Sequence, residues 1–386
     1  MRSSPSVVAP RPPENNPVVD GGGSLEPGAP PQCCVEVVVV SSGKRAGAVR
    51  GIAWLVAYLG AAALLWTSVA PIGSAAPAAH IVGETPGPGR VLRISVHSPA
   101  MDRDIPLQVL PAKDSRTPAP TLYLLNGAGG GEDAATWLAQ TDAADFFADK
   151  HVNVVIPMEG AFSYYTDWER DDPGLAKKLK NNGRNKWATF LTDELPPVID
   201  SAFGTTGANA LAGISMAGTS VLDLAIEAPA LYRSVSAYSG CAMTSDPLGQ
   251  SFVSLVISLG KGDATNMWGP VGGEGWKAHD PYLHADRLPR IPMYISSASG
   301  LPGRHDSLAD PSVRANTGVL ANQVLLGGGI ESAANYCTTK LAERTRELGR
   351  TDITYTFHPA GTHSWGYWQD DLHKSWPMMA AAIGAN

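Results

Sequence analysis

The sequence predicts an α/β fold with a mainly parallel central sheet. Apolar segments with the character of strands lie at residues 121–126, 152–157, 208–214, 234–239, 292–297 and 353–357. Longer helical stretches separate them, among them residues 187–203, 220–228 and 331–348. This alternation is typical of parallel strands joined by right-handed helical crossovers. The roughly 300 residues that carry it suit one large domain.

Three regions are expected along the chain. Residues 1–50 are rich in Pro, Gly and Ser, which predicts a disordered segment. Residues 51–79 combine an apolar run with small residues near 74–79 and follow basic residues, which predicts a signal peptide or a signal-anchor. Either outcome places the third region, the α/β domain at residues 80–386, outside the cytoplasmic membrane.

The segment Gly-Ile-Ser-Met-Ala-Gly at residues 213–218 carries the first chemical signal. It joins an apolar strand to a helix, so that strand, tight turn and helix converge on Ser215. This is the pattern of the nucleophile elbow of an α/β-hydrolase fold. The N–H of Met216 would then be an oxyanion donor at the helix N-terminus. A serine that caps a helix is the alternative for so short a motif.

A serine nucleophile needs a base, and the chain order in this fold is Ser, acid, His. Of the nine histidines, only His363 lies on a Gly-containing loop directly after a predicted strand. The acid is not determined by the residues alone. Glu331, Asp306 and Asp310 all lie between the serine and the histidine.

Several separated strings make the chain similar to a known family. They lie at residues 122–127, 163–168, 186–196, 213–218, 266–270 and 361–368. Over roughly residues 90–384, the chain resembles the antigen 85 mycolyltransferases of mycobacteria and related actinobacteria.

The resemblance implies a role for particular residues. The family's catalytic Glu lies a fixed distance before its Thr-His-Ser-Trp histidine, and Glu331 matches it, 32 residues before His363. The resemblance also implies that Ala128 supplies the second oxyanion N–H. The substrate-binding residues that we expect are Asn126, Gly127, Trp268 and Trp365.

One departure concerns the acyl acceptor. The family carries an Asp and an Arg in the loop after the first core strand, on the trehalose side of its pocket. Here those positions are Asn126 and Gly129. We expect the Asn126 amide still to bond a sugar hydroxyl, with free trehalose a weaker acceptor than in the family.

The resemblance therefore implies an exported serine acyltransferase. It would move a mycolyl-type chain from an acylated trehalose donor, through a Ser215 acyl-enzyme, to a sugar or cell-wall acceptor. Two alternatives remain: a secreted carboxylesterase that delivers the acyl group to water, and a non-catalytic wall-binding protein.

Composition and motifs argue against other classes. The net charge of −7 without a basic cluster disfavours nucleic-acid binding. No G-x-G-x-x-G or P-loop string indicates a nucleotide, no H-E-x-x-H indicates a metal, and no cofactor is expected. The oligomeric state is not specified by any of these features.

Four cysteines fall into two pairs. Cys33 and Cys34 are adjacent in the leader. Cys241 and Cys337 lie in the domain expected to be exported, where a disulfide would persist. We expect a bridge between them, with two buried free thiols as the alternative.

Overall fold

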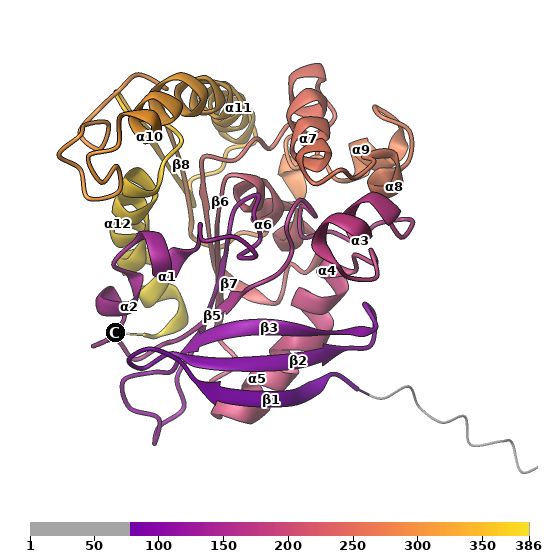
Figure 1. Cartoon of the computed structure of the whole chain (residues 1–386), viewed down its shortest axis with the longest axis vertical. Helices are drawn as coiled ribbons and strands as arrows, with labels where there is room; N and C mark the ends of the chain where they lie inside the picture. The colour runs from indigo at the N-terminus through magenta and orange to yellow at the C-terminus, as the bar shows by residue number, and fades with distance from the viewer. Residues whose placement is uncertain (1–77, 386) are drawn as a thin grey trace, which may run out of the picture. The chain divides into compact units, whose positions relative to one another are not determined.

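The computed structural model describes residues 78–385 (Figure 1). The predicted segments at 1–50 and, except for its last two residues, at 51–79 lie outside this described part. The described chain forms a nine-stranded sheet in the order β1-β2-β3-β5-β4-β6-β7-β8-β9. From β5 to β9 in that order, every neighbouring pair is parallel.

The six parallel strands are the six predicted from the sequence. They are β4 (Thr121–Leu125), β5 (Asn153–Pro157), β6 (Asn209–Ile214), β7 (Tyr232–Tyr238), β8 (Met293–Ala298) and β9 (Ile353–His358). Every residue of β4, β5, β6 and β8 is buried, as expected for parallel strands covered on both faces. The predicted α/β-hydrolase fold class is thus confirmed.

Three further strands were not predicted. β1 (His80–Pro86), β2 (Leu92–Ser98) and β3 (Arg103–Leu110) form an antiparallel extension at one edge, drawn in indigo in Figure 1. β3 pairs antiparallel with β5 and so joins the extension to the parallel sheet. The signal was present in the sequence of β2, LRISVHS, because apolar and polar residues alternate along it, the period-2 pattern of a half-buried strand.

Helices lie on both faces of the sheet. The shorter helical segments are α1 (Trp137–Gln140), α2 (Ala143–Phe146), α3 (Pro173–Leu179), α4 (Trp187–Thr189), η1 (Phe190–Glu194), α5 (Leu195–Phe203), α8 (Thr265–Trp268), α9 (Glu274–Ala278), η2 (Ala285–Arg287), α10 (Thr317–Asn322) and η3 (Gln323–Gly327). The longer helices are α6 (Met216–Glu227), α7 (Pro247–Leu259), α11 (Gly328–Glu347) and α12 (Trp365–Ile383).

The core divides into two clusters because successive side chains of a strand point to opposite faces. Leu122 and Leu124 of β4 pack in a cluster with side chains of α1 and α12. Tyr123 and Leu125 pack in the other cluster, with side chains of α5 and α6. Within residues 78–385, no helix has both the length and the apolar character to cross a membrane.

Candidate active site

The turn between β6 and α6 holds Ser215 in a backbone conformation that few L-residues adopt, with φ of 55°. Close packing around the turn explains the small residues beside it. A Cβ on Gly213 would lie 2.8 Å from the carbonyl oxygen of Ala217, and one on Gly218 would lie 2.7 Å from that of Tyr238. The strand–turn–helix expected for a nucleophile elbow is therefore present.

Ser215, His363 and Glu331 lie in one line of hydrogen bonds. His363 Nε2 is 2.7 Å from Ser215 Oγ, and His363 Nδ1 is 2.7 Å from Glu331 Oε2. The serine follows β6, the glutamate is on α11, and the histidine lies on the loop between β9 and α12. Three segments that are distant in sequence thus meet at the carboxyl ends of the parallel strands. In this arrangement the imidazole can take a proton from the serine while the carboxylate holds its other nitrogen.

Glu331 is held firmly in this position. Its side chain is buried, and its second oxygen, Oε1, accepts hydrogen bonds from Ser239 Oγ at 2.9 Å and from the N–H of Ala298 at 2.6 Å. Ser239 Oγ in turn accepts a bond from the indole N–H of Trp368. Glu331 is the fourth residue of α11 rather than its first, because η3 and α11 run on from Gln323 without a break.

Sequence reasoning missed Ser239. The residue directly follows β7, the neighbour of β6 in the sheet. A polar residue at the carboxyl end of a central parallel strand lies at the edge where such folds bind ligands. That position was the available signal.

The two other candidate acids, Asp310 and Asp306, have different partners. Asp310 accepts a bond from Nδ1 of His305 at 2.7 Å. Asp306 accepts a bond from Thr362, one residue before His363, at 2.6 Å. Of the three acids, Glu331 is the one whose carboxylate bonds His363.

Of the expected oxyanion donors, Met216 directly follows the serine and Ala128 lies on the loop after β4. Met216 is the first residue of α6, so its N–H has no acceptor within the helix. The loop after β4 packs against the elbow, since a Cβ on Gly127 would lie 3.5 Å from Ser215 Cβ. Ala128 follows on this loop, and its carbonyl accepts a bond from the N–H of Phe162. That bond holds the backbone around the expected second donor.

Two of the expected substrate-binding residues do not face a substrate. Asn126 is fully buried, its amide donates to the carbonyl of Pro157, and its oxygen accepts from the N–H of Trp137. Trp268 is 3% exposed, and its ring stacks on His279. The expectation that the Asn126 amide bonds a sugar hydroxyl and that Trp268 offers a sugar-facing surface is wrong, because both side chains are used in packing.

Two cavities flank His363. The first, of about 50 Å³, opens at Ser215 and is largely apolar. Its wall contains Tyr164, Met216, Phe252, Val256, Ile330 and Ala334. The second, of about 260 Å³, has the half-buried Trp365 in its wall. Of the four residues expected to bind substrate, Trp365 lies beside His363 and Gly127 lies beside Ser215.

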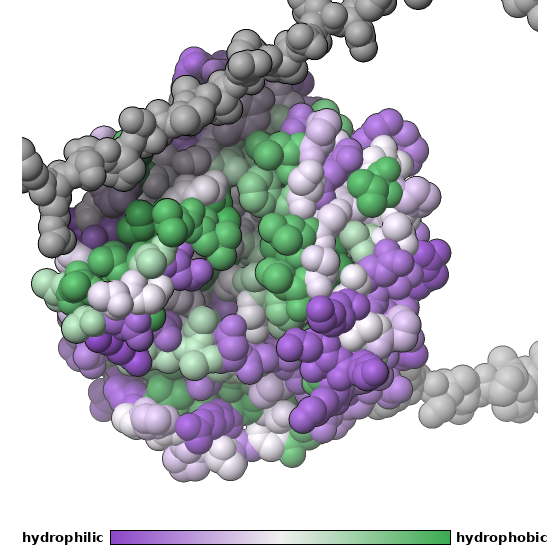
Figure 2. Space-filling model, turned by 45° about the horizontal axis from the view of Figure 1, so that its top comes forward, coloured by the Kyte–Doolittle hydropathy of each residue, from purple (hydrophilic) through white to green (hydrophobic). Residues whose placement is uncertain are grey.

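Exposed apolar side chains occur on the same elements as these cavities. Leu255 and Leu259 lie on α7, and Leu325 and Leu326 on η3. Figure 2 shows apolar residues in green around a hollow on the face that comes forward when the top of Figure 1 is tilted toward the viewer.

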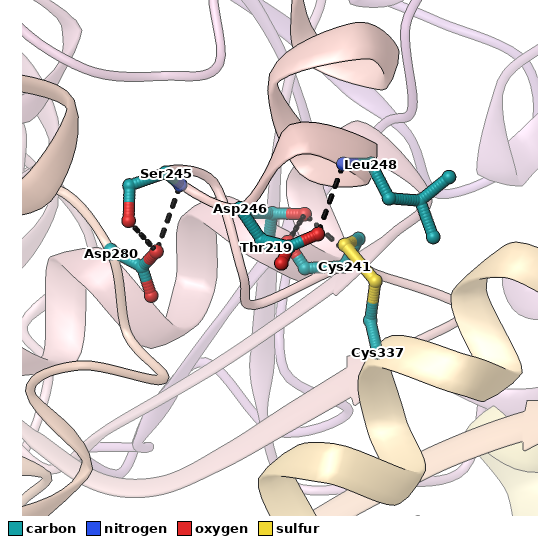
Figure 3. The surroundings of a disulfide bond; sticks show 7 residues. All are labelled: Thr219, Cys241, Ser245, Asp246, Leu248, Asp280 and Cys337. Carbon is teal, nitrogen blue, oxygen red and sulfur yellow. Dashed lines mark hydrogen bonds between the residues drawn. A yellow bond between two sulfur atoms is a disulfide. The ribbon is translucent and has the colours of Figure 1, made fainter. Parts of the chain in front are cut away.

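A disulfide joins Cys241 to Cys337 across a sequence separation of 96 residues. It ties α11, the helix of Glu331, to the loop between β7 and α7 (Figure 3). Thr219 of α6 bonds the backbone N–H and carbonyl of Cys241, at 3.0 and 3.1 Å. Cys241 and Thr219 both line the first cavity, so the bridge is part of the surroundings of the serine.

A second ionisable cluster lies at the far end of α6. Ligand atoms of Asp223, Glu227 and His279 lie within 4.8 Å of one another, a spacing that a metal ion could use. Here, however, His279 Nδ1 lies 2.8 Å from Asp223 and 3.3 Å from Glu227. Although burial opposes its charge, the bonds to both carboxylates raise the pKa of His279 to about 10. The imidazolium therefore acts as the cation of this cluster.

The fold and the strand–turn–helix around Ser215 are those of the esterases and acyltransferases with an α/β-hydrolase fold. A family model described as "Putative esterase" matches residues 98–379. The chain is 31% identical over 299 residues to the diacylglycerol acyltransferase/mycolyltransferase Ag85A of Mycobacterium leprae, covering 76% of this chain and 83% of the relative. It is 30% identical over 346 residues to Ag85A of Mycobacterium tuberculosis, covering 88% and 94%.

The chain belongs to this esterase family and, within it, to the antigen 85-type mycolyltransferases. Among solved structures, MPT51 (FbpC1) of Mycobacterium tuberculosis matches with a TM-score of 0.60 and 26% identity, covering 74% of this chain and 96% of MPT51. An S-formylglutathione hydrolase from Agrobacterium tumefaciens matches with a TM-score of 0.52 at 16% identity, covering 79% of this chain and 100% of the hydrolase, a likeness of fold alone.

Proposed function

We propose that the protein is an exported serine acyltransferase that moves a mycolyl-type acyl chain from a trehalose ester to a sugar or cell-wall hydroxyl. The observation that carries the proposal is the hydrogen-bonded line from Ser215 through His363 to Glu331. Membership of a family whose members are named mycolyltransferases supports acyl transfer as the type of reaction.

The first half of the reaction makes an acyl-enzyme. His363 Nε2 accepts the proton of Ser215 Oγ as the oxygen attacks the ester carbonyl carbon. The negative charge that develops on the carbonyl oxygen is stabilised by the N–H groups of Met216 and Ala128. His363 then gives its proton to the departing sugar oxygen, and the acyl group remains on Ser215. Glu331 holds Nδ1 of His363 and stabilises the imidazolium that forms.

The second half reverses these steps with a new alcohol. His363 takes the proton of the acceptor hydroxyl, the acceptor oxygen attacks the acyl carbon, and the bond to Ser215 Oγ breaks as Oγ regains a proton from His363. Transfer rather than hydrolysis requires that the acceptor displaces water from the site. The apolar wall of the first cavity and the exposed leucines nearby suit an acyl chain that arrives from a lipid-like donor.

Export is part of the proposal. The leader at residues 51–79 is proposed to be a signal peptide or signal-anchor, with the catalytic domain beyond it. The disulfide between Cys241 and Cys337 supports an oxidising compartment, because such bridges are rare where thiols are kept reduced.

A product assay with trehalose monomycolate tests the function. We expect the wild type to produce trehalose dimycolate, or a mycolyl ester of an added wall acceptor. We expect no turnover from Ser215→Ala. Free mycolic acid as the sole product would identify the protein as an esterase. If the wild type neither turns over nor reacts with a serine-directed phosphonate, the catalytic assignment is wrong and the wall-binding alternative stands.

A further inference from the structure

The second cavity beside His363 is lined by uncharged groups that can form hydrogen bonds. Its polar lining comes from Gln140, Ser312, Asn322, Gln323 and Ser364, with the indole of Trp365 beside them. Among the described residues that line it, none is Asp, Glu, Lys or Arg. Amides and hydroxyls next to an aromatic ring suit a neutral polyhydroxyl molecule better than a charged one.

Two of the lining amides are held by acceptors of the chain. Gln140 Nε2 donates to the carbonyl of Ala134 at 3.0 Å, and the amide of Gln323 has two acceptors. Its Nε2 donates to the carboxylate of Asp306 at 2.7 Å and to the carbonyl of His305 at 3.0 Å. Both partners are acceptors, so the NH₂ group must face them and the amide cannot be flipped. Within residues 78–385, no hydrogen bond reaches Gln323 Oε1, which leaves this oxygen able to accept from a hydroxyl in the cavity.

Asp306 fixes this arrangement from several sides. Beyond Gln323, its carboxylate accepts bonds from the N–H of Gly303, from Thr362 Oγ1 and from the hydroxyl of Tyr367, at 2.7, 2.6 and 2.7 Å. The donors come from three parts of the chain: the Asp306 loop itself, the loop that carries His363, and α12. A carboxylate with four donors is fully satisfied and has little freedom to move.

The same group of bonds also holds His363. Thr362 is its neighbour in the chain, and the N–H of His363 donates to the carbonyl of Gly327 at 3.2 Å. Gly327 is the last residue of η3, the segment that Gln323 begins. Asp306 therefore positions His363 through its bond to Thr362. Through its bond to Gln323, Asp306 also positions the cavity wall beside His363.

We propose that Gln323, held by Asp306, is the residue that orients the hydroxylated acceptor in the second half of the reaction. One acceptor hydroxyl donates to Gln323 Oε1. A neighbouring hydroxyl then gives its proton to His363 Nε2 while its oxygen forms the bond to the acyl carbon and the bond to Ser215 Oγ breaks. Asp306 is a positioning residue for both Gln323 and His363. This inference rests on the proposed acyltransferase function.

The test separates acylation from transfer. The probes are p-nitrophenyl butyrate as donor and trehalose, arabinose or glycerol as acceptor, each at one fixed concentration. The burst of p-nitrophenol reports acylation of Ser215, and the ratio of butyryl ester to butyrate reports the choice between polyol and water. Gln323→Met keeps the length of the side chain and removes the acceptor oxygen, together with the NH₂ bonds to Asp306 and to the carbonyl of His305. Gln250→Met, on α7 and outside the lining of both cavities, is the matched control.

We expect Gln323→Met to lower the burst rate less than the ester-to-butyrate ratio, because the other three donors to Asp306 remain. Its ester-to-butyrate ratio with the preferred polyol should fall about tenfold, the size expected for one lost hydrogen bond. Gln250→Met should change neither value. Asp306→Asn places an NH₂ group against donors, so it should lower both the burst rate and the ratio, with the ratio falling further.

Each other outcome contradicts a different claim. If the wild type transfers to a polyol and Gln323→Met does so equally well, the role of Gln323 is refuted and the acyltransferase function stands. A wild type that shows the burst but yields butyrate alone with all three polyols would refute the transferase function, and with it the acceptor site. Absence of a burst would refute the serine mechanism itself.

Discussion

Replacing Glu331 by Gln changes one carboxylate oxygen into an NH₂ group and leaves the size of the side chain nearly unchanged. The surroundings determine where that NH₂ group points. Glu331 Oε1 now accepts from two donors, the backbone N–H of Ala298 and the hydroxyl of Ser239. The Ala298 N–H cannot turn around, and Ser239 already accepts from Trp368. The amide oxygen of the variant must therefore stay there, and its NH₂ group must face Nδ1 of His363.

This orientation gives His363 the wrong tautomer. An NH₂ group donates to Nδ1, so the ring proton moves to Nε2, the nitrogen that lies 2.7 Å from Ser215 Oγ. A protonated Nε2 cannot accept the serine proton. We therefore expect Glu331→Gln to lower turnover by about 10⁴-fold, as for the same change in other triads, which corresponds to about 5.5 kcal/mol of transition-state stabilisation.

The assay is the steady-state hydrolysis of p-nitrophenyl butyrate, with circular dichroism to check that each variant is folded. Asp310→Asn is the matched control, because it makes the same chemical change in an acid that bonds His305 rather than His363. It should retain turnover within about threefold of the wild type. The assignment of the acid would be refuted if the turnover of Glu331→Gln were within tenfold of that of the wild type. A larger loss of turnover in Asp310→Asn than in Glu331→Gln would refute it as well.

Three further predictions concern stability. Changing Cys241 and Cys337 to Ser opens a loop of 96 residues and should cost at most roughly 4–5 kcal/mol. The Tm should then fall by several degrees, whereas an unchanged Tm would argue against the bridge. The pKa of His279, about 10 in the folded protein, lies above its ordinary value of 6.5. Protonation of His279 therefore makes its full contribution to the free energy of unfolding below pH 6.5, and that contribution is lost as the pH rises through 10. Thermal melts should thus show a Tm that falls between pH 7 and 10, with a smaller fall in His279→Gln; equal slopes would contradict this. Asn126→Asp removes the donor to the Pro157 carbonyl and buries a charge, so it should lower the Tm by melting curves without improving trehalose as acceptor. A folded variant with improved trehalose transfer would restore Asn126 as an acceptor-side residue.

Some features of the site and of the fold can be recognised from contiguous stretches of sequence. The elbow around Ser215 could be recognised because its strand, turn and helix are contiguous, and because packing against Ala217 and Tyr238 demands small residues there. The six parallel strands were recognisable because burial on both faces requires apolar runs. The antiparallel strands β1 to β3 were missed, although β2 alternates in burial.

The sequence by itself determined the fold class, the elbow serine and the histidine loop, because each depends on neighbours in the chain. The resemblance to a family, not the residue pattern, favoured Glu331 among the three acids. Only the tertiary structure brought Glu331 to His363, buried Asn126 and Trp268 in the packing, and joined Asp306 to Gln323. Those contacts link segments far apart in sequence, and the direction in which a side chain points depends on the residues packed around it.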